Sequence, residues 1–291
     1  MQLTIKECPV CTEKEFERSI TAKDYLITKE TFQIVKCTNC SFQFTNPRPF
    51  DFELGKYYQS LNYDSHNTKS SSLKDILYNT VRNISTARKL KYIKSIAAGT
   101  NLLDIGSGAG YFINYCHKNN WSVEGVEPNL QSFPDINAEI KIHSNYNTIG
   151  KEAFDIITMW HSLEHVGKLE EVLKTVSAAL KDDGKLIIAV PNIASFDFNY
   201  YQEYWAGLDV PRHLYHFTQT SMKLLVERYG LKIIKTMPLI FDSYYVSLLS
   251  EKYKTGQLNY LTAFRMGWKS NKWAKVNNND YSSLMYTITK K

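Results

Sequence analysis

The sequence predicts an α/β protein with a doubly wound, mostly parallel sheet and a small β-rich module at its N-terminus. Three observations lead to this fold class. Short apolar segments alternate with helical patterns between residues 101 and 190. A glycine-rich turn follows the first of these segments, and two pairs of cysteines lie near the N-terminus. Strands that alternate with helices form parallel sheets covered on both faces. Paired cysteines are typical of small metal-binding modules.

The alternation allows each element of the sheet to be placed. Apolar side chains recur at helical spacing over residues 73–96, which predicts a long helix. Residues 154–160 carry little polarity, as expected for a strand covered on both faces. The turn Asp182-Asp183-Gly184 leads into a further strand. The predicted strands are 101–105, 122–126, 154–160 and 185–190, and the predicted helices between them are 111–119 and 168–180.

The C-terminal third predicts two more strands with helices inserted between them. Thr218 is a helix N-cap, and Gly230 ends a helix that runs to Arg228. Strands are predicted at 231–237 and 282–289, where they could pair antiparallel. The inserted helices occupy about residues 243–270. The domains predicted are a module at 1–50, a linker at 51–72 and the α/β domain at 73–291.

The composition is that of a folded protein, with 43% hydrophobic and 22% charged residues. No apolar run approaches the ~18–20 residues of a membrane span. The first residues lack the apolar stretch of a secretory signal, so we expect a cytoplasmic protein. The net charge of +6 is uneven: residues 101–200 carry seven basic and thirteen acidic side chains, and residues 251–291 carry eight and two. The acidic central region argues against a phosphate-rich polymer lying across it.

A strand, an acid, a glycine turn and a helix follow one another at residues 102–111. Asp104 lies at the carboxyl end of the strand, where open α/β sheets bind ligands. The glycines let the backbone turn tightly and approach a ligand, and the helix offers unpaired N–H groups. Glu127 ends the next strand, where a carboxylate can accept both hydroxyls of a ribose. The turn contains Gly106, Ser107, Gly108 and Gly110.

The glycine turn predicts a nucleoside that carries an amino acid rather than a dinucleotide. Tyr111 occupies a position where the dinucleotide fingerprint has a small residue. Asp104 would repel a pyrophosphate, but it suits an ammonium group.

At these residues the sequence resembles the class I S-adenosylmethionine-dependent methyltransferases, whose motif reads D-x-G-x-G-x-G. The resemblance extends to residues 154–157 and to Trp160–Val166, which is similar to an H-x-L-E-H-V segment. It implies a Rossmann-like seven-stranded sheet, with Asp104 and the glycine turn at the methionine end of the cofactor and Glu127 at the ribose. Asp183 departs from the family's L-K-x-G-G turn. The other cofactor-binding residues that it implies are Tyr111, Pro128, Trp160 and His161.

The family's adenine-contacting acid has no clear counterpart in this sequence. Ser144-Asn145-Tyr146-Asn147 occupies the corresponding region. Asn145 or Tyr146 could bond to the base or stack on it.

The N-terminal cysteines predict a zinc-ribbon-like module. Two C-x-x-C pairs present four thiolates from two tight turns, the usual arrangement for a closed tetrahedral zinc site. Such a site is structural and leaves no position for catalysis. The alternatives are four reduced thiols in a small core, or a redox pair. The pairs are Cys8 with Cys11 and Cys37 with Cys40, while Cys116 is alone.

During methyl transfer, an oxygen, nitrogen or acidic carbon nucleophile often needs a base, and histidine can serve as one. The candidate catalytic residues are His213 and His161. His161 follows the fourth strand. His213 lies in the segment 199–217, which is rich in aromatic and polar side chains and could cover the acceptor. A P-R-H-L-x-x-F-T pattern there resembles a bacterial subgroup related to the ubiquinone-biosynthesis methyltransferases. For each histidine, and for His165, His216 and His143, a structural hydrogen-bonding role is the alternative.

The leading functional prediction is a methyltransferase that acts on a small-molecule or carbohydrate-related acceptor. A four-cysteine module before this fold also resembles bacterial deoxysugar C-methyltransferases; these have a longer C-terminal domain, so the resemblance is partial. The first alternative is an RNA base methyltransferase, for which the basic segments 69–94 and 251–291 could form one patch. The second is a non-catalytic protein that binds a partner and has a vestigial cofactor pocket.

Overall fold

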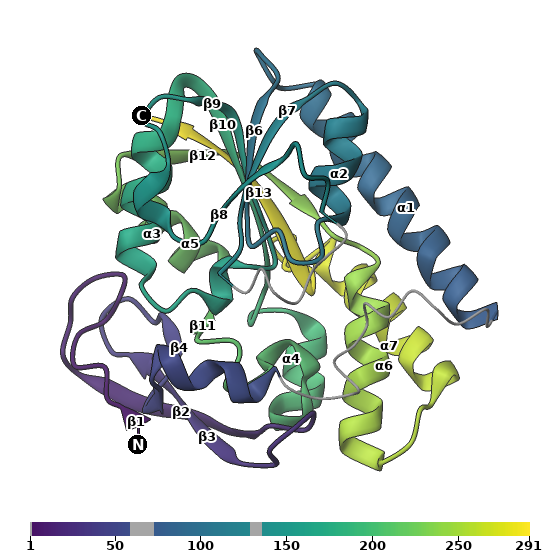
Figure 1. Cartoon of the computed structure of the whole chain (residues 1–291). Coiled ribbons are helices and arrows are strands. Elements are labelled where there is room, and N and C mark those ends of the chain that lie inside the picture. The colour runs from purple at the N-terminus through teal and green to yellow at the C-terminus, as the bar shows by residue number, and fades with distance from the viewer. Residues whose placement is uncertain (1, 59–72, 129–135) are drawn as a thin grey trace.

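The large sheet contains the seven strands that the α/β prediction requires. The computed structural model describes residues 2–58, 73–128 and 136–291, and for residues 73–81 it describes the backbone only. The sheet order is β12-β13-β10-β9-β6-β7-β8 (Figure 1). Strand β13 is antiparallel to both of its neighbours, and the strands from β10 to β8 are parallel, so the predicted fold class is confirmed. The bounds are β6 Asn101–Ile105, β7 Ser122–Val126, β8 Lys141–His143, β9 Phe154–Trp160, β10 Leu180–Pro191, β12 Leu231–Pro238 and β13 Ser283–Lys290.

Helices cover both faces of this sheet because apolar side chains point alternately to either side. In β6, Leu102 packs in the cluster that includes Phe112 of α2, whereas Leu103 packs with Leu173 of α3. Strands buried on both faces read as continuous apolar runs, as β9 does. One face carries α1 (Leu73–Lys94) and α2 (Tyr111–Lys118), and the other carries α3 (Leu169–Ala179) and α5 (Gln219–Arg228) (Figure 1).

Two local features differ from the sequence prediction. The turn predicted at Asp182-Asp183-Gly184 is a bulge within β10, because five residue steps from Leu180 to Lys185 face two steps from Phe154 to Ile156. Strand β8 has only three residues and was not predicted, since so short a segment has no periodicity to recognise.

The helices inserted between β12 and β13 are α6 (Asp242–Thr255) and α7 (Tyr260–Ala274), in agreement with the prediction. They pack closely, because a Cβ at Gly267 would lie 2.7 Å from the Tyr244 ring. Across the described residues, no helix combines the length and the apolar character needed to cross a membrane.

A second sheet combines the N-terminal residues with a strand from the 199–217 segment. Its order is β11-β4-β3-β2, with β2 Phe16–Lys23, β3 Thr31–Cys37, β4 Gln43–Thr45 and β11 Tyr215–His216. Strand β11 pairs antiparallel with β4 through Tyr215 opposite Phe44. Strands β1 (Gln2–Leu3) and β5 (Arg48–Pro49) form a separate pair. The segment begins within α4 (Phe196–Tyr201) and contains two short 3-10 helices, Gln202–Tyr204 and Ala206–Leu208.

The N-terminal sheet shares its core with the α/β domain. Phe42 and Phe44 belong to the same buried cluster as Leu225 and Leu103. Of the predicted linker, residues 51–57 form the 3-10 helix η1 (Asp51–Tyr57), in which Tyr57 is buried and donates a hydrogen bond to Glu30. Residues 59–72 lie outside the described part of the chain. The module predicted at 1–50 is thus integrated with the rest of the structure through packing.

Candidate cofactor and acceptor site

The glycine turn lies between the carboxyl end of β6 and the start of α2. Gly106 and Gly110 have φ values of +76° and +75°, in the left-handed region that favours glycine. A Cβ at Gly106 would lie 2.5 Å from the Cβ of Ser162. A Cβ at Gly108 would meet nothing within 4 Å. The turn is therefore close-packed at its first glycine and has space beside Gly108.

The two predicted carboxylates lie at the ends of neighbouring strands and face this turn. The Gly108 N–H donates to Oε2 of Glu127 at 2.9 Å. Asp104 Oδ1 accepts a hydrogen bond of 2.5 Å from the hydroxyl of Thr158. Burial raises the pKa of Asp104 to about 7, although the Thr158 hydrogen bond opposes the shift. Both carboxylates are buried, so a cationic or hydroxyl-bearing ligand would gain strong interactions there.

Lys89 and Trp160 complete this side of the site. The Lys89 ammonium lies 4.2 Å from the centroid of the Trp160 ring. Burial lowers the pKa of Lys89, while the charge of Asp104 opposes that shift. The indole Nε1 of Trp160 is buried and has no hydrogen-bond partner within the described part of the chain. Trp160 was predicted to bind cofactor, whereas Lys89 was missed because a lysine on a predicted helix carries no signal of its own.

The other residues predicted to bind the cofactor have partners or surroundings of their own. Burial, followed by the charges of Glu127 and Glu171, raises the pKa of Tyr146 to about 12. The Asn145 side chain is exposed and accepts from the N–H of Asn147, so it caps its own turn. Tyr111 stacks against the guanidinium of Arg82 at 3.6 Å. Pro128 is exposed at the start of a region that the structure does not describe.

His161 is held between two carboxylates. Its Nδ1 lies 3.4 Å from Glu164 Oε1, and its Nε2 lies 3.2 Å from Asp242 Oδ2. Burial would lower the pKa of His161, but its interactions with the carboxylates of Asp242 and Glu164 raise it to about 10. The imidazole is therefore protonated near neutral pH and has no lone pair. The base role predicted for His161 does not agree with this arrangement.

Glu164 and His165 of the 3-10 helix η4 (Leu163–His165), which follows β9, form a cluster with His213, in which His165 is half-buried. One ligand atom from each lies within 4.8 Å of the others. Within the described part of the chain, neither oxygen of the Glu164 carboxylate accepts a hydrogen bond. Burial would raise the pKa of Glu164, but the neighbouring histidines, His161 first, lower it. Such a set could bind a cation or accept a proton from a bound molecule.

Backbone carbonyls fix the tautomers of both histidines in this cluster. His213 Nδ1 lies 2.9 Å from the carbonyl oxygen of Gly207, which can only accept. A hydrogen therefore sits on Nδ1, and in the neutral ring the lone pair is on Nε2. His165 Nδ1 contacts the carbonyl of Arg212 at 3.1 Å in the same way. Burial lowers the pKa of His165 to about 4, so this ring is neutral.

The 199–217 segment that carries His213 is anchored to the N-terminal sheet. The buried Arg212 guanidinium binds Asp209 at 2.6 Å and Asp24 at 3.0 Å. The Thr45 hydroxyl donates to the His213 carbonyl at 3.0 Å and lies 3.3 Å from His216 Nε2. Burial lowers the pKa of His216 to about 3, so His216 is neutral and structural. The segment is therefore packed firmly against the N-terminal sheet, next to Glu164 and His165. Its pairing with residues 43–45 could not be predicted, because no local sequence pattern records a contact between segments so far apart.

The four N-terminal cysteines converge in two turns of the same geometry. The Thr12 N–H donates to the Cys8 carbonyl at 2.9 Å, and the Ser41 N–H donates to the Cys37 carbonyl at 3.0 Å. Thr12 and Ser41 have matching φ values of +64° and +60°. All four Sγ atoms lie within 4.8 Å of one another. The closest pairs are Cys8 with Cys40 and Cys11 with Cys37, each at 3.5 Å, close to the ~3.8 Å between thiolates on one tetrahedral zinc.

In this sheet a glycine turn follows β6, and an acidic residue lies at the carboxyl end of β6 and of its neighbour β7. This arrangement is typical of domains that bind a nucleoside cofactor. A family model described as a methyltransferase domain matches residues 80–236, more than half of the chain. The chain belongs to this methyltransferase family.

The chain is similar to several solved structures at low sequence identity. An S-adenosylmethionine-dependent methyltransferase from Archaeoglobus fulgidus is 18% identical with a TM-score of 0.48, and the match covers 72% of this chain and 94% of that one. Another from Thermotoga maritima is 18% identical with a TM-score of 0.49, covering 74% and 96%. None of the curated proteins matches the sequence. The family assignment therefore rests on the family model.

Proposed function

We propose that this protein transfers a methyl group from S-adenosylmethionine to a small-molecule or carbohydrate-related acceptor. The proposal depends mainly on the hydrogen bond from the Gly108 N–H to the Glu127 carboxylate, together with the buried Asp104 on the neighbouring strand. The bound cofactor would supply an electrophilic methyl group on sulfur. Asp104 suits the ammonium of its methionine end, and Glu127 suits the ribose hydroxyls. Lys89 offers a cation for the methionine carboxylate.

The acceptor side of the proposal places the nucleophile beside Glu164 and His213. In the neutral His213 ring the lone pair is on Nε2, because Nδ1 donates to the Gly207 carbonyl. We propose that it takes the proton from the acceptor as the new bond to the methyl carbon forms and the bond to sulfur breaks. The imidazolium that results would lie near the carboxylates of Glu164 and Asp209, and opposite charges favour it. His161, protonated and bound to Glu164, would fix that carboxylate in place.

A labelled-methyl experiment tests this function against its alternatives. The full chain is incubated with S-adenosylmethionine carrying a labelled methyl group, together with either the small-molecule fraction or the total RNA of a cell extract. We expect label in the small-molecule fraction only. Label in RNA would favour a base methyltransferase. Cofactor binding with no transfer to either fraction would favour a non-catalytic partner-binding protein.

We further propose that Cys8, Cys11, Cys37 and Cys40 bind one structural zinc ion. The matched turns and the converging sulfurs support this proposal. Four thiolates complete a tetrahedral zinc, so the ion would hold the module together and take no part in the reaction. Because β4 of this module pairs with β11, the zinc would also stabilise the 199–217 segment, which contains His213.

A further inference from the structure

Helices α6 and α7 carry a set of large apolar side chains that are mostly exposed in the described part of the chain. On α7, Leu261 is 81% exposed, Phe264 is 63% exposed and Trp268 is 50% exposed. These positions follow the three- and four-residue spacing of one helical face. On α6 and just before it, Tyr245 and Phe241 are exposed as well. We call these five residues the α6–α7 face.

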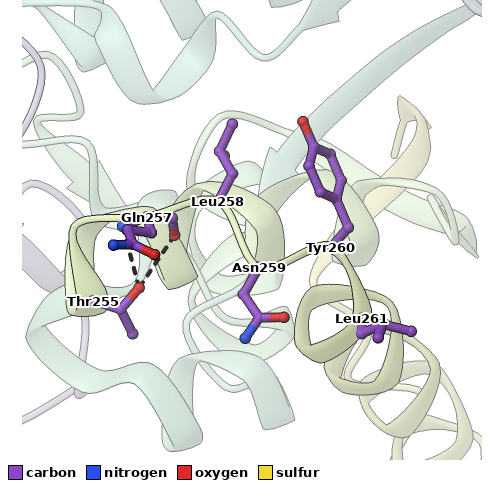
Figure 2. Close-up of a pocket in the computed structure, with 6 residues that line it drawn as sticks. All are labelled: Thr255, Gln257, Leu258, Asn259, Tyr260 and Leu261. Atoms are coloured by element: carbon purple, nitrogen blue, oxygen red, sulfur yellow. Dashed lines mark hydrogen bonds between the residues drawn. The ribbon is translucent and has the colours of Figure 1, made fainter.

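The turn between the two helices extends this face. Figure 2 shows Leu258, Tyr260 and Leu261 beside a pocket in the turn, where Thr255 hydrogen-bonds to both backbone groups of Gln257. Leu258 and Tyr260 are 45% and 58% exposed. The pocket includes none of the predicted cofactor residues. Several large apolar groups thus gather at one end of the molecule, a concentration that marks an interaction surface.

Basic side chains border the apolar positions. Each residue of a helix turns it by about 100°, so Arg265, Lys269 and Lys272 lie along one flank of the Leu261 and Trp268 stripe. All three are exposed. Residues 240–276 contain six basic and two acidic side chains. Both acids have partners inside the protein, since Asp242 contacts His161 and Glu251 accepts from Tyr201. The face therefore presents positive charge to its surroundings.

The face cannot become buried by a simple rotation of the helices, because their inner sides are already packed. The Ser243 hydroxyl donates to the Gly267 carbonyl between α6 and α7. The Ser270 hydroxyl donates to buried Asp197 of α4. The exposed side chains are thus held on a rigid base, which suits a surface that meets a partner without refolding.

We propose that the α6–α7 face binds the surface of a membrane that contains anionic phospholipids. An amphipathic helix with aromatic and leucine residues on one side and flanking lysine and arginine is the usual interfacial pattern. Nucleic acid is a poorer match, since Leu261 and the equally exposed Val276 offer no ring for stacking on bases. A second copy is also poorer, because a two-fold contact would place the same cations against each other.

This proposal goes beyond methyl transfer and holds whichever acceptor is used. One end of α6 lies next to a predicted site residue, because the carboxylate of Asp242, the first residue of α6, lies 3.2 Å from His161.

Vesicle co-sedimentation of the full chain tests the proposal. The protein is mixed with vesicles of phosphatidylcholine alone, or of phosphatidylcholine with an equal amount of phosphatidylglycerol. We expect sedimentation with the anionic vesicles only, weakening as salt rises. The double variants Leu261→Ser with Phe264→Ser, and Lys269→Glu with Lys272→Glu, should each reduce binding about tenfold or more. The matched controls are Leu224→Ser and Lys223→Glu on α5, which should bind normally.

Three results would overturn the membrane assignment. The first is no binding to either vesicle, or equal binding to both. The second is a loss of binding in the α5 controls that matches the loss in the α7 variants. The third is binding of poly(U), or a dimer seen by sedimentation velocity, that is lost in the α7 variants while vesicle binding is absent. Cofactor affinity measured by calorimetry should be unchanged in every variant, which separates this test from that of the proposed function.

Discussion

Glu127 illustrates how one side chain can be prepared for a ligand before the ligand arrives. Its carboxylate accepts from Gly108, in the part of the turn that has free space. Replacing it with alanine should weaken S-adenosylmethionine binding by about 1–3 kcal/mol, the scale of hydrogen bonds to a charged group. Titration calorimetry measures the change, and NAD should show no binding to either protein. Glu170→Gln on the surface of α3 is the control. Unchanged affinity in the Glu127 variant would exclude the ribose assignment.

His213 is the residue on which the proposed chemistry depends. Its alanine variant should lower turnover by about a hundredfold or more, the range of general base effects. Cofactor affinity should change little, because Asp104 and Glu127 lie on the large sheet. Steady-state kinetics with the identified acceptor provides the measurement. Normal turnover, or a joint loss of cofactor binding and thermal stability, would reduce His213 to a structural residue.

Among the histidines, His216 should make stability depend on pH. Its pKa falls to about 3 in the folded protein, against 6.5 ordinarily. Between these values the unfolded chain binds the proton and the folded chain does not, so this contribution to stability is lost as pH falls below about 6.5. His216→Gln should show a smaller loss of unfolding free energy between pH 7 and pH 4 in urea titrations. His117→Gln at a partly exposed site is the control, and equal slopes in all three proteins would contradict the prediction.

At the scale of elements, the pairing of β11 with β4 connects two distant parts of the chain. Thr45 supports it with a buried hydroxyl that contacts both His213 and His216. Thr45→Val keeps the side-chain shape but leaves these groups without their partner. We expect a loss of about 1–3 kcal/mol in unfolding free energy, with turnover lowered more than cofactor affinity.

Chemical denaturation and calorimetry on the same samples check this expectation. Thr38→Val provides a matched control, because its hydroxyl makes one exposed hydrogen bond to Glu15. A Thr45 variant that is as stable and active as this control would show that the pairing does not depend on the hydroxyl.

At the scale of the whole molecule, the cysteine turns should influence a site on the other sheet. Protein purified without chelator should contain one zinc per chain by elemental analysis. Cys37→Ser should lose the metal and melt at a lower temperature. Because the N-terminal sheet includes β11, turnover should fall as well, while cofactor affinity stays close to normal.

Cys116→Ala, which changes a lone buried cysteine of another core cluster, controls for a general loss of packing. A well-folded wild-type protein without metal would refute the zinc site. Cofactor affinity lost together with the metal would indicate that the two sheets unfold as one unit.

The sequence by itself determined the features that are local in the chain. Asp104, the glycine turn and Glu127 could be identified because a strand, a turn and the next strand carry their geometry within 26 residues. The cysteine turns and the Thr218 cap are local in the same sense, and the structure has both. The alternation of apolar segments also determined the large sheet, since its period follows directly from strand and helix geometry.

Only the tertiary structure decided which distant residues meet. It joins β4 to β11 across roughly 170 residues of chain, brings Lys89 over Trp160, and gathers Glu164, His165 and His213 within 4.8 Å of one another. It also gives His161 two carboxylate partners, which turns a predicted base into a cation. Such contacts arise from packing between elements. They leave no periodicity in the sequence, because each segment has the same local pattern of apolar and polar residues whether or not its distant partner is present.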